Sequence, residues 1–149
     1  MPSRLVILVL WLALLAAACS DSTTITTGTE APSTVTTDPA GSIVFGSGSV
    51  PETMPGGFPI PEAAVIGSTL IDRDRGLTEM VMRAKADVTA LTAFFETNLP
   101  VRGFTVDSSR EEGDGRKIEF SGDDGSGTVD VTAAGQGVSQ ALITFIDGS

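Results

Sequence analysis

The chain has 149 residues and a formal net charge of −10, with nine basic and nineteen acidic residues, no histidine, no tyrosine and one cysteine. An acidic chain offers nucleic acid no basic face, so we expect no nucleic-acid partner. Without histidine, and with its one cysteine near the N-terminus, the chain lacks Ser-His and Cys-His nucleophile pairs and most kinds of zinc site. We therefore expect neither an enzyme nor a bound cofactor.

The first eighteen residues have the pattern of an export signal. A short basic start ends at Arg4, the run Leu5 to Leu15 is apolar, three alanines follow, and polar sequence begins at Ser20. A charged start, a short apolar run and small residues before a cleavage site are typical of a secretory signal peptide. The apolar run is too short for a membrane-spanning helix, which needs about 20 residues. Residues 1–18 are therefore predicted to be a signal peptide.

The apolar run ends in Leu15-Ala16-Ala17-Ala18-Cys19. This stretch resembles the lipobox of bacterial lipoproteins, although Ala16 stands where the commonest pattern has leucine. The resemblance implies that Cys19 carries a thioether-linked diacylglycerol with acyl chains of the palmitate type. It also implies that Cys19 becomes the mature N-terminus. Two acyl chains give stable anchoring, which implies a protein held at the cell membrane with its domain on the extracytoplasmic side. The alternative is an ordinary cleaved signal whose cysteine has no such role.

Residues 19–57 are predicted to be the lipidated cysteine and a disordered tether. Serine and threonine make up more than half of Ser20 to Ala40, and Gly41 to Pro61 continues in glycine, serine and proline. Such a composition buries too little apolar surface to offset the entropy of ordering. The tether is either bare or O-glycosylated. The short apolar run Ile43-Val44-Phe45 leaves open that this part docks on the domain.

A globular domain is predicted for residues 58–149, and it begins with a hairpin. Ala63 to Ile71 is rich in β-branched residues, Asp72 to Gly76 is typical of a turn, and Leu77 to Ala86 alternates in polarity. The alternation places Met80, Met82, Ala84 and Ala86 on one side and Glu79, Val81, Arg83 and Lys85 on the other.

One amphipathic helix follows the hairpin. Asp87 is the expected N-cap, and Pro100 is expected to end the helix. Apolar side chains recur at steps of three and four residues, so they form one stripe that faces the sheet. The stripe consists of Val88, Leu91, Phe94, Phe95 and Leu99.

Three or four strands are expected after the helix. The first begins at Phe104 and is interrupted from Asp107 to Gly115; the others cover residues 116–120, 128–133 and 139–146. Ile118, Phe120, Val129 and Val131 are expected to point inward. The predicted fold is a two-layer α+β domain, an antiparallel sheet of about six strands in the order β-β-α-β-β-β-β with one helix packed on a face. The order of the strands within the sheet stays open.

Pro59-Ile60-Pro61, Phe94-Phe95-x-x-x-Leu99 and Gly103-Phe104 give the domain a second resemblance. Together they resemble small uncharacterised envelope lipoproteins of actinobacteria, over about residues 58–145. The resemblance implies a fold and a compartment, and it brings no active site with it.

Acidic side chains gather in two expected turns, and a calcium site there is conceivable because calcium takes oxygen ligands from irregular loops. The spacing does not match an EF-hand, and Arg110, Arg116 and Lys117 neutralise part of the first group. We interpret both groups as solvated turn charges and assign no metal ligand and no catalytic residue. The carboxylates concerned are Asp107, Glu111, Glu112, Asp114, Asp123 and Asp124.

The outward side of the sheet is the candidate interaction face, because apolar residues on a polar face mark interaction sites. The candidate residues are Val81, Arg83, Lys85, Leu142 and Ile146. The sequence thus predicts a lipid-anchored, non-enzymatic interaction module of the cell envelope, with an envelope protein as its partner. The alternative is a carrier of a lipid or other small apolar ligand, held in a gap between helix and sheet lined by Met80, Met82 and Phe95.

Overall fold

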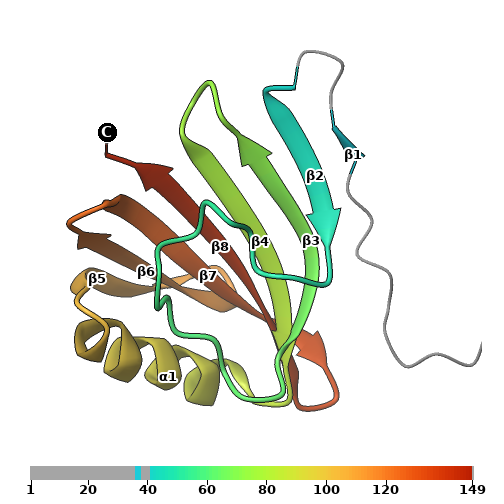
Figure 1. Cartoon of the computed structure of the whole chain (residues 1–149). Helices are drawn as coiled ribbons and strands as arrows, with labels where there is room; N and C mark the ends of the chain where they lie inside the picture. The colour runs from blue at the N-terminus through green and yellow to red at the C-terminus, as the bar shows by residue number, and fades with distance from the viewer. Residues whose placement is uncertain (1–35, 38–40, 149) are drawn as a thin grey trace, which may run out of the picture. The chain divides into compact units, whose positions relative to one another are not determined.

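The computed structural model describes residues 36–37 and 41–148. In this part of the chain, strands β1 to β8 form one antiparallel sheet and helix α1 lies on one of its faces (Figure 1). The predicted class, an α+β fold with one helix on an antiparallel sheet, is confirmed. The elements are β1 Thr36–Thr37, β2 Ile43–Ser47, β3 Val65–Asp72, β4 Leu77–Ala84, α1 Val88–Val101, β5 Thr105–Glu112, β6 Gly115–Gly122, β7 Gly125–Gly135 and β8 Val138–Asp147. The predicted signal peptide and Cys19 lie outside the described residues.

The strand order is β1-β2-β3-β4-β8-β7-β6-β5. After β4 the chain passes through α1 to the far edge of the sheet and returns strand by strand until β8 lies against β4. The pairing of Met80 with Ile143 and of Val81 with Leu142 joins the two halves of the sequence. The last strand of the chain is therefore central in the sheet.

The segment between β1 and β3 departs from the prediction of a tether. Residues Ile43–Ser47 pair with Ser68–Asp72 of β3, and Met54 and Phe58 are buried in the core. The prediction that the disordered tether reaches residue 57 is therefore wrong for residues 41–57, and docking of Ile43-Val44-Phe45 is what the structure shows. The composition is misleading here because a partner strand supplies the hydrogen bonds and the burial that the segment lacks by itself.

The core lies between the sheet and a layer made by α1 and residues 48–64. Helix α1 packs against β5, β6 and β7, and residues 48–64 run along the same side of the sheet (Figure 1). The Phe58 ring joins the two parts, with its centroid 6.2 Å from that of Phe95 and 5.6 Å from that of Phe120. The inward residues predicted for β4, β6 and β7 are buried: Met80, Met82, Ala84, Ile118, Phe120, Val129 and Val131.

Helix α1 begins as predicted and ends slightly later. The Ala90 backbone N–H donates to the Asp87 carboxylate at 2.8 Å, which confirms the N-cap. Leu91, Phe95 and Leu99 are buried, whereas Phe94 is partly exposed. Pro100 lies within the last turn, and the helix continues to Val101. Pro100 removes one N–H donor from the last turn, and the Arg102 backbone N–H still closes that turn by donating to the Asn98 and Leu99 carbonyls.

Strand β5 is continuous where an interruption was predicted. It runs from Thr105 to Glu112 with a register shift between Val106 and Ser108, and only Gly113 and Asp114 lie in the following turn. The predicted interruption from Asp107 to Gly115 is therefore wrong. The bulge shifts the side-chain alternation by one residue. The sequence of this polar edge strand therefore lacks the regular two-residue period by which strands are recognised.

Candidate interaction surface

One face of the sheet carries no described layer, and we call it the open face. Helix α1 and residues 48–64 both cover the opposite face (Figure 1). The alternation along β4 shows the difference, because Met80 and Met82 have no exposed surface whereas Val81 between them is partly exposed. Side chains that point to the open face are therefore available to a partner.

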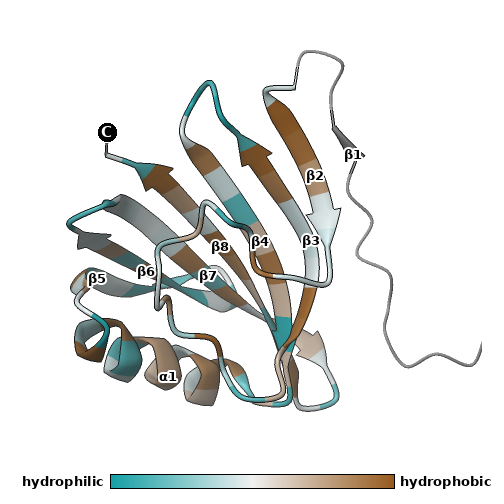
Figure 2. Ribbon diagram, in the orientation of Figure 1, coloured by the Kyte–Doolittle hydropathy of each residue, from teal (hydrophilic) through white to brown (hydrophobic). Residues whose placement is uncertain are grey.

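The open face carries apolar side chains over β2, β3, β4 and β8, and Glu79, opposite Leu70 and Thr144, lies among them. The register places Phe45 opposite Leu70, Leu77 opposite Ile146 and Val81 opposite Leu142. Figure 2 shows the hydrophobic segments of these neighbouring strands side by side. Phe45 is 49% exposed and Ile146 is 50% exposed. We call this surface the apolar half; it consists of Ile43, Phe45, Leu70, Leu77, Val81, Leu142 and Ile146.

Four of the five candidate residues from the sequence come together on this face. Val81, Leu142 and Ile146 belong to the apolar half, and Arg83 lies at its end, where its Nε donates to Gln140 Oε1 at 3.4 Å. Lys85 is exposed just beyond the end of β4. The residues of β2 and β3 were missed, because their place beside β4 depends on strand pairing. The alternation of Ile43 and Phe45 was the one local signal that they share a face.

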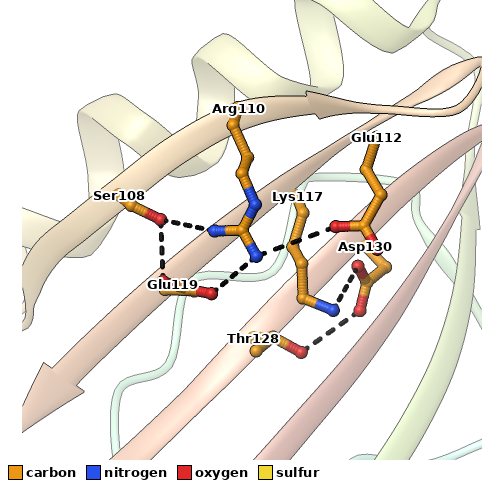
Figure 3. A network of polar contacts seen from close by, with 7 residues as sticks. All are labelled: Ser108, Arg110, Glu112, Lys117, Glu119, Thr128 and Asp130. Carbon is orange, nitrogen blue, oxygen red and sulfur yellow. Dashed lines mark hydrogen bonds and ion pairs between the residues drawn. The ribbon is translucent and has the colours of Figure 1, made fainter.

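Over β5, β6 and β7 the same face carries paired charges, shown in Figure 3. Arg110 lies 2.8 Å from Glu119, and Lys117 lies 3.2 Å from Asp130 on the neighbouring strand. The Ser108 hydroxyl donates to Glu119 at 2.9 Å. We call this surface the charged half; it consists of Ser108, Arg110, Glu112, Lys117, Glu119, Thr128 and Asp130.

Hydrogen bonding keeps the central pair of the charged half ionised. The hydrogen bond from Arg110, and then the one from Ser108, lowers the pKa of Glu119. The same bond to Glu119 raises the pKa of Arg110. Both groups therefore find their partners within the domain. Cross-strand pairs of this kind hold neighbouring strands in register.

The gap that would hold an apolar ligand between helix and sheet is filled. Met80, Met82 and Phe95 have no exposed surface, and a side chain bordering a ligand-sized hollow would keep some. An apolar cleft of about 690 Å³ lies elsewhere, between residues 61–65, the end of β4 and the first half of α1. Its walls include Ala86, Ala90 and Phe94, with Lys85 at the same cleft.

The acidic turns form no cation site within the described residues, where no group of three or more His, Cys, Asp or Glu residues could hold a metal ion. Several of these carboxylates instead have separate polar partners. Asp107 accepts a hydrogen bond from Ser121 at 3.1 Å, and Glu112 lies 3.8 Å from Arg110.

Across residues 36–37 and 41–148, no helix is long and apolar enough to span a membrane. The comparisons with known proteins add no functional residue. No model of a known protein family, no curated protein and no solved structure matches the chain.

Proposed function

We propose that the protein is a lipid-anchored component of the cell envelope whose domain is a non-enzymatic interaction module that works through the open face. The observation that carries this proposal is the apolar half, which extends over four adjacent strands and is covered by no described residue. Exposed apolar patches on a small domain favour association, because covering them removes apolar surface from water.

The anchor is the second part of the proposal. The lipobox-like Leu15-Ala16-Ala17-Ala18-Cys19 supports a diacylglycerol at Cys19 and a position on the extracytoplasmic side of the cell membrane. Since the folded domain reaches back to β1, only sixteen residues separate Cys19 from Thr36. The open face would thus meet other components of the envelope at short range.

An interaction role is favoured over catalysis by the chemistry of the polar side chains. The sequence has no histidine to act as a general base near neutral pH. Two carboxylates of the open face, Glu119 and Asp130, are each paired with a cation. This pairing suits a structural role, since a catalytic acid or base needs a proton that it can exchange.

A carrier of a small apolar ligand is the second candidate, and the cleft beside Phe94 favours it. A volume of about 690 Å³ falls within the range of ligand pockets, about 300–1,000 Å³. Native mass spectrometry of the protein after removal of free lipid separates the two functions. A bound apolar molecule that is lost on Ala90→Trp, which fills the cleft, would favour the carrier.

Two measurements test the main proposal. Intact-mass analysis should show a diacylglycerol on Cys19 in membrane-bound protein, and Cys19→Ala should remove both the added mass and stable membrane retention. A photo-crosslinking amino acid at Leu142 should give adducts in intact cells, whereas the same group at Thr128 should not. These positions are matched, because both are partly exposed on the open face and they differ in which half they occupy. Unmodified Cys19 in membranes, or equal adducts from both positions, would contradict the proposal.

A further inference from the structure

A hollow of about 470 Å³ lies on the side of the sheet opposite the open face, between helix α1 and the end of the β5–β6 hairpin. Thr89 and Ala93 of α1 and Glu111 and Asp114 of the hairpin line it and are exposed, so the hollow is open to solvent. Its volume falls within the range of small-molecule sites, about 300–1,000 Å³. The hollow is therefore large enough for a ligand and accessible to one.

Arg116 lines the hollow, and its guanidinium group is only partly satisfied. Its Nη2 donates to the Ser109 hydroxyl at 3.2 Å, and that hydroxyl donates to the Glu96 carboxylate. Its Nη1 lies 3.9 Å from Glu111 Oε1, which is too far for a hydrogen bond. Its Nε is buried and has no hydrogen-bond partner among the described residues. Because buried polar groups nearly always have a partner, Arg116 has donors that a bound molecule can use.

Hydrogen-bond acceptors without partners line the same hollow. Within the described part of the chain, Asp114 makes no hydrogen bond or ion pair. Glu111 has only the long contact with Arg116, and its side chain is 85% exposed. Val88 and Ala93 add a small apolar surface on the helix side. The hollow thus offers donors, acceptors and an apolar surface to one ligand.

The charge of the hollow restricts the class of ligand. Three acidic residues, Glu96, Glu111 and Asp114, and one basic residue, Arg116, line it, which gives a net charge of −2. Phosphates and carboxylates are therefore repelled. An amine balances the charge, but it offers no acceptor to the unused donors of Arg116. A neutral ligand whose hydroxyl groups both donate and accept pairs with both kinds of side chain.

We propose that this hollow binds a neutral sugar, either free or within a polysaccharide. Arg116 donates to the sugar hydroxyls, Glu111 and Asp114 accept from them, and the C–H groups of the ring pack on Val88 and Ala93. The inference goes beyond the proposed function, because it concerns the opposite side of the sheet and depends neither on the apolar half nor on Cys19.

The test uses NMR of the full chain, with ¹⁵N-labelled arginine, in a polyoxyethylene detergent that has no sugar headgroup. The Arg116 Nε–H signal is assigned by its loss in Arg116→Lys. The neutral probes are disaccharides of glucose, galactose, mannose and N-acetylglucosamine, and the charged probes are the disaccharides of glucosamine and galacturonic acid. We expect a saturable shift with at least one neutral disaccharide, and severalfold weaker binding of both charged ones. No shift with any neutral disaccharide, or tightest binding of a charged one, would overturn the inference.

Two pairs of variants assign the binding to the hollow. Ala93→Trp fills it and should weaken binding severalfold, whereas Val101→Trp, at the exposed end of the same helix, should leave binding unchanged. Arg116→Lys keeps the charge and loses the planar set of donors, so it should also weaken binding, with Arg102→Lys as the exposed control. Isothermal titration with the neutral disaccharide measures all four variants, and circular dichroism verifies their fold. If Arg116→Lys unfolds, the tryptophan pair decides, and equal affinity of that pair would overturn the inference.

The length of the sugar distinguishes its source. Affinity that rises severalfold from the disaccharide to the hexasaccharide supports the inference with a polysaccharide as the ligand. Equal affinity supports it with a free sugar. Failure of every neutral probe overturns this inference alone, because lipid on Cys19 and crosslinking from the open face are measured separately.

Discussion

The two halves of the open face share one sheet and differ in how their side chains are satisfied. In the charged half, Arg110 pairs with Glu119 and Lys117 with Asp130, so each ionic group has a partner within the domain. In the apolar half, Phe45 and Ile146 keep about half of their surface exposed. Exposed apolar surface costs about 25 cal/mol per Å² relative to burial. The charged half thus satisfies its ionic groups within the domain, whereas the apolar half leaves apolar surface exposed, and the proposed contact rests on this difference.

Chain topology explains the difference. Strands β5, β6 and β7 follow one another through short turns, so their charges face each other across neighbouring strands. The apolar half instead joins β2, β3 and β4 to β8, the last strand of the chain. Its contacts form only when the sheet is complete, and no described residue covers its outward side.

The largest expected effect concerns residues 36–57, which build the edge of the apolar half. A chain beginning at Phe58 should be much less stable than one beginning at Ala31, because it loses β2 and the buried Met54 side chain. Loss of a buried methionine alone costs about 2–5 kcal/mol, and about 1 kcal/mol lowers the thermal midpoint by roughly 4–8 °C. Thermal unfolding of both chains measures this. Equal midpoints would restore the view that residues 41–57 are a tether.

The layer beneath the sheet should be nearly as sensitive. Phe95 has no exposed surface and its ring lies 6.2 Å from that of Phe58, so Phe95→Ala should cost about 3–5 kcal/mol. Phe94→Ala is the control, since Phe94 is partly exposed and should lose clearly less. Urea denaturation of the two variants makes the comparison. A larger loss for Phe94 would show that the helix is rotated relative to the sheet.

Two isoleucines of β8 test the open face against the core directly. Ile143 is fully buried and Ile146 is 50% exposed, although both are on one strand. Ile143→Ala should cost about 2–5 kcal/mol, whereas Ile146→Ala should cost less than about 1 kcal/mol while weakening the contact of the open face. Urea denaturation reports the first effect, and photo-crosslinking from Leu142 in intact cells reports the second. A similar loss of stability at both positions would mean that the apolar half is covered.

The smallest effect is expected in the charged half, and it depends on pH. The hydrogen bonds from Arg110 and Ser108 hold the pKa of Glu119 below its usual value, which is about 4.3 in an unfolded chain. The stabilisation is therefore present above the usual pKa and is lost as pH falls through the lower folded pKa. Glu119→Gln should reduce the loss of stability that accompanies the fall to acidic pH. Urea unfolding at a series of pH values from neutral to acidic tests it, with Glu62→Gln as a surface control. An unchanged pH dependence of stability would show that the Arg110–Glu119 pair is too solvated to contribute to the stability of the domain.

Local sequence determined the elements whose partners lie close in the chain. The helix followed from its Asp87 cap and from the spacing of Leu91, Phe95 and Leu99, because a helix satisfies its hydrogen bonds within itself. The β3–β4 hairpin followed from a turn and from the alternation of Met80 and Met82, since adjacent strands pair without a choice of partner. The inward and outward sides of β4 were therefore correct before any strand order was known.

Tertiary structure alone decided which outward residues meet. The alternation of Val81 with Met82, and of Leu142 with Ile143, identified both outward positions, but only the pairing of β4 with β8 places Val81 against Leu142. Residues 43–47 became a strand because β3 offered an open edge, against a composition that favours disorder. Strand pairing depends on which distant segment supplies the matching hydrogen-bond partners. The pairing is determined by the sheet as a whole, so it cannot be predicted from any local sequence pattern.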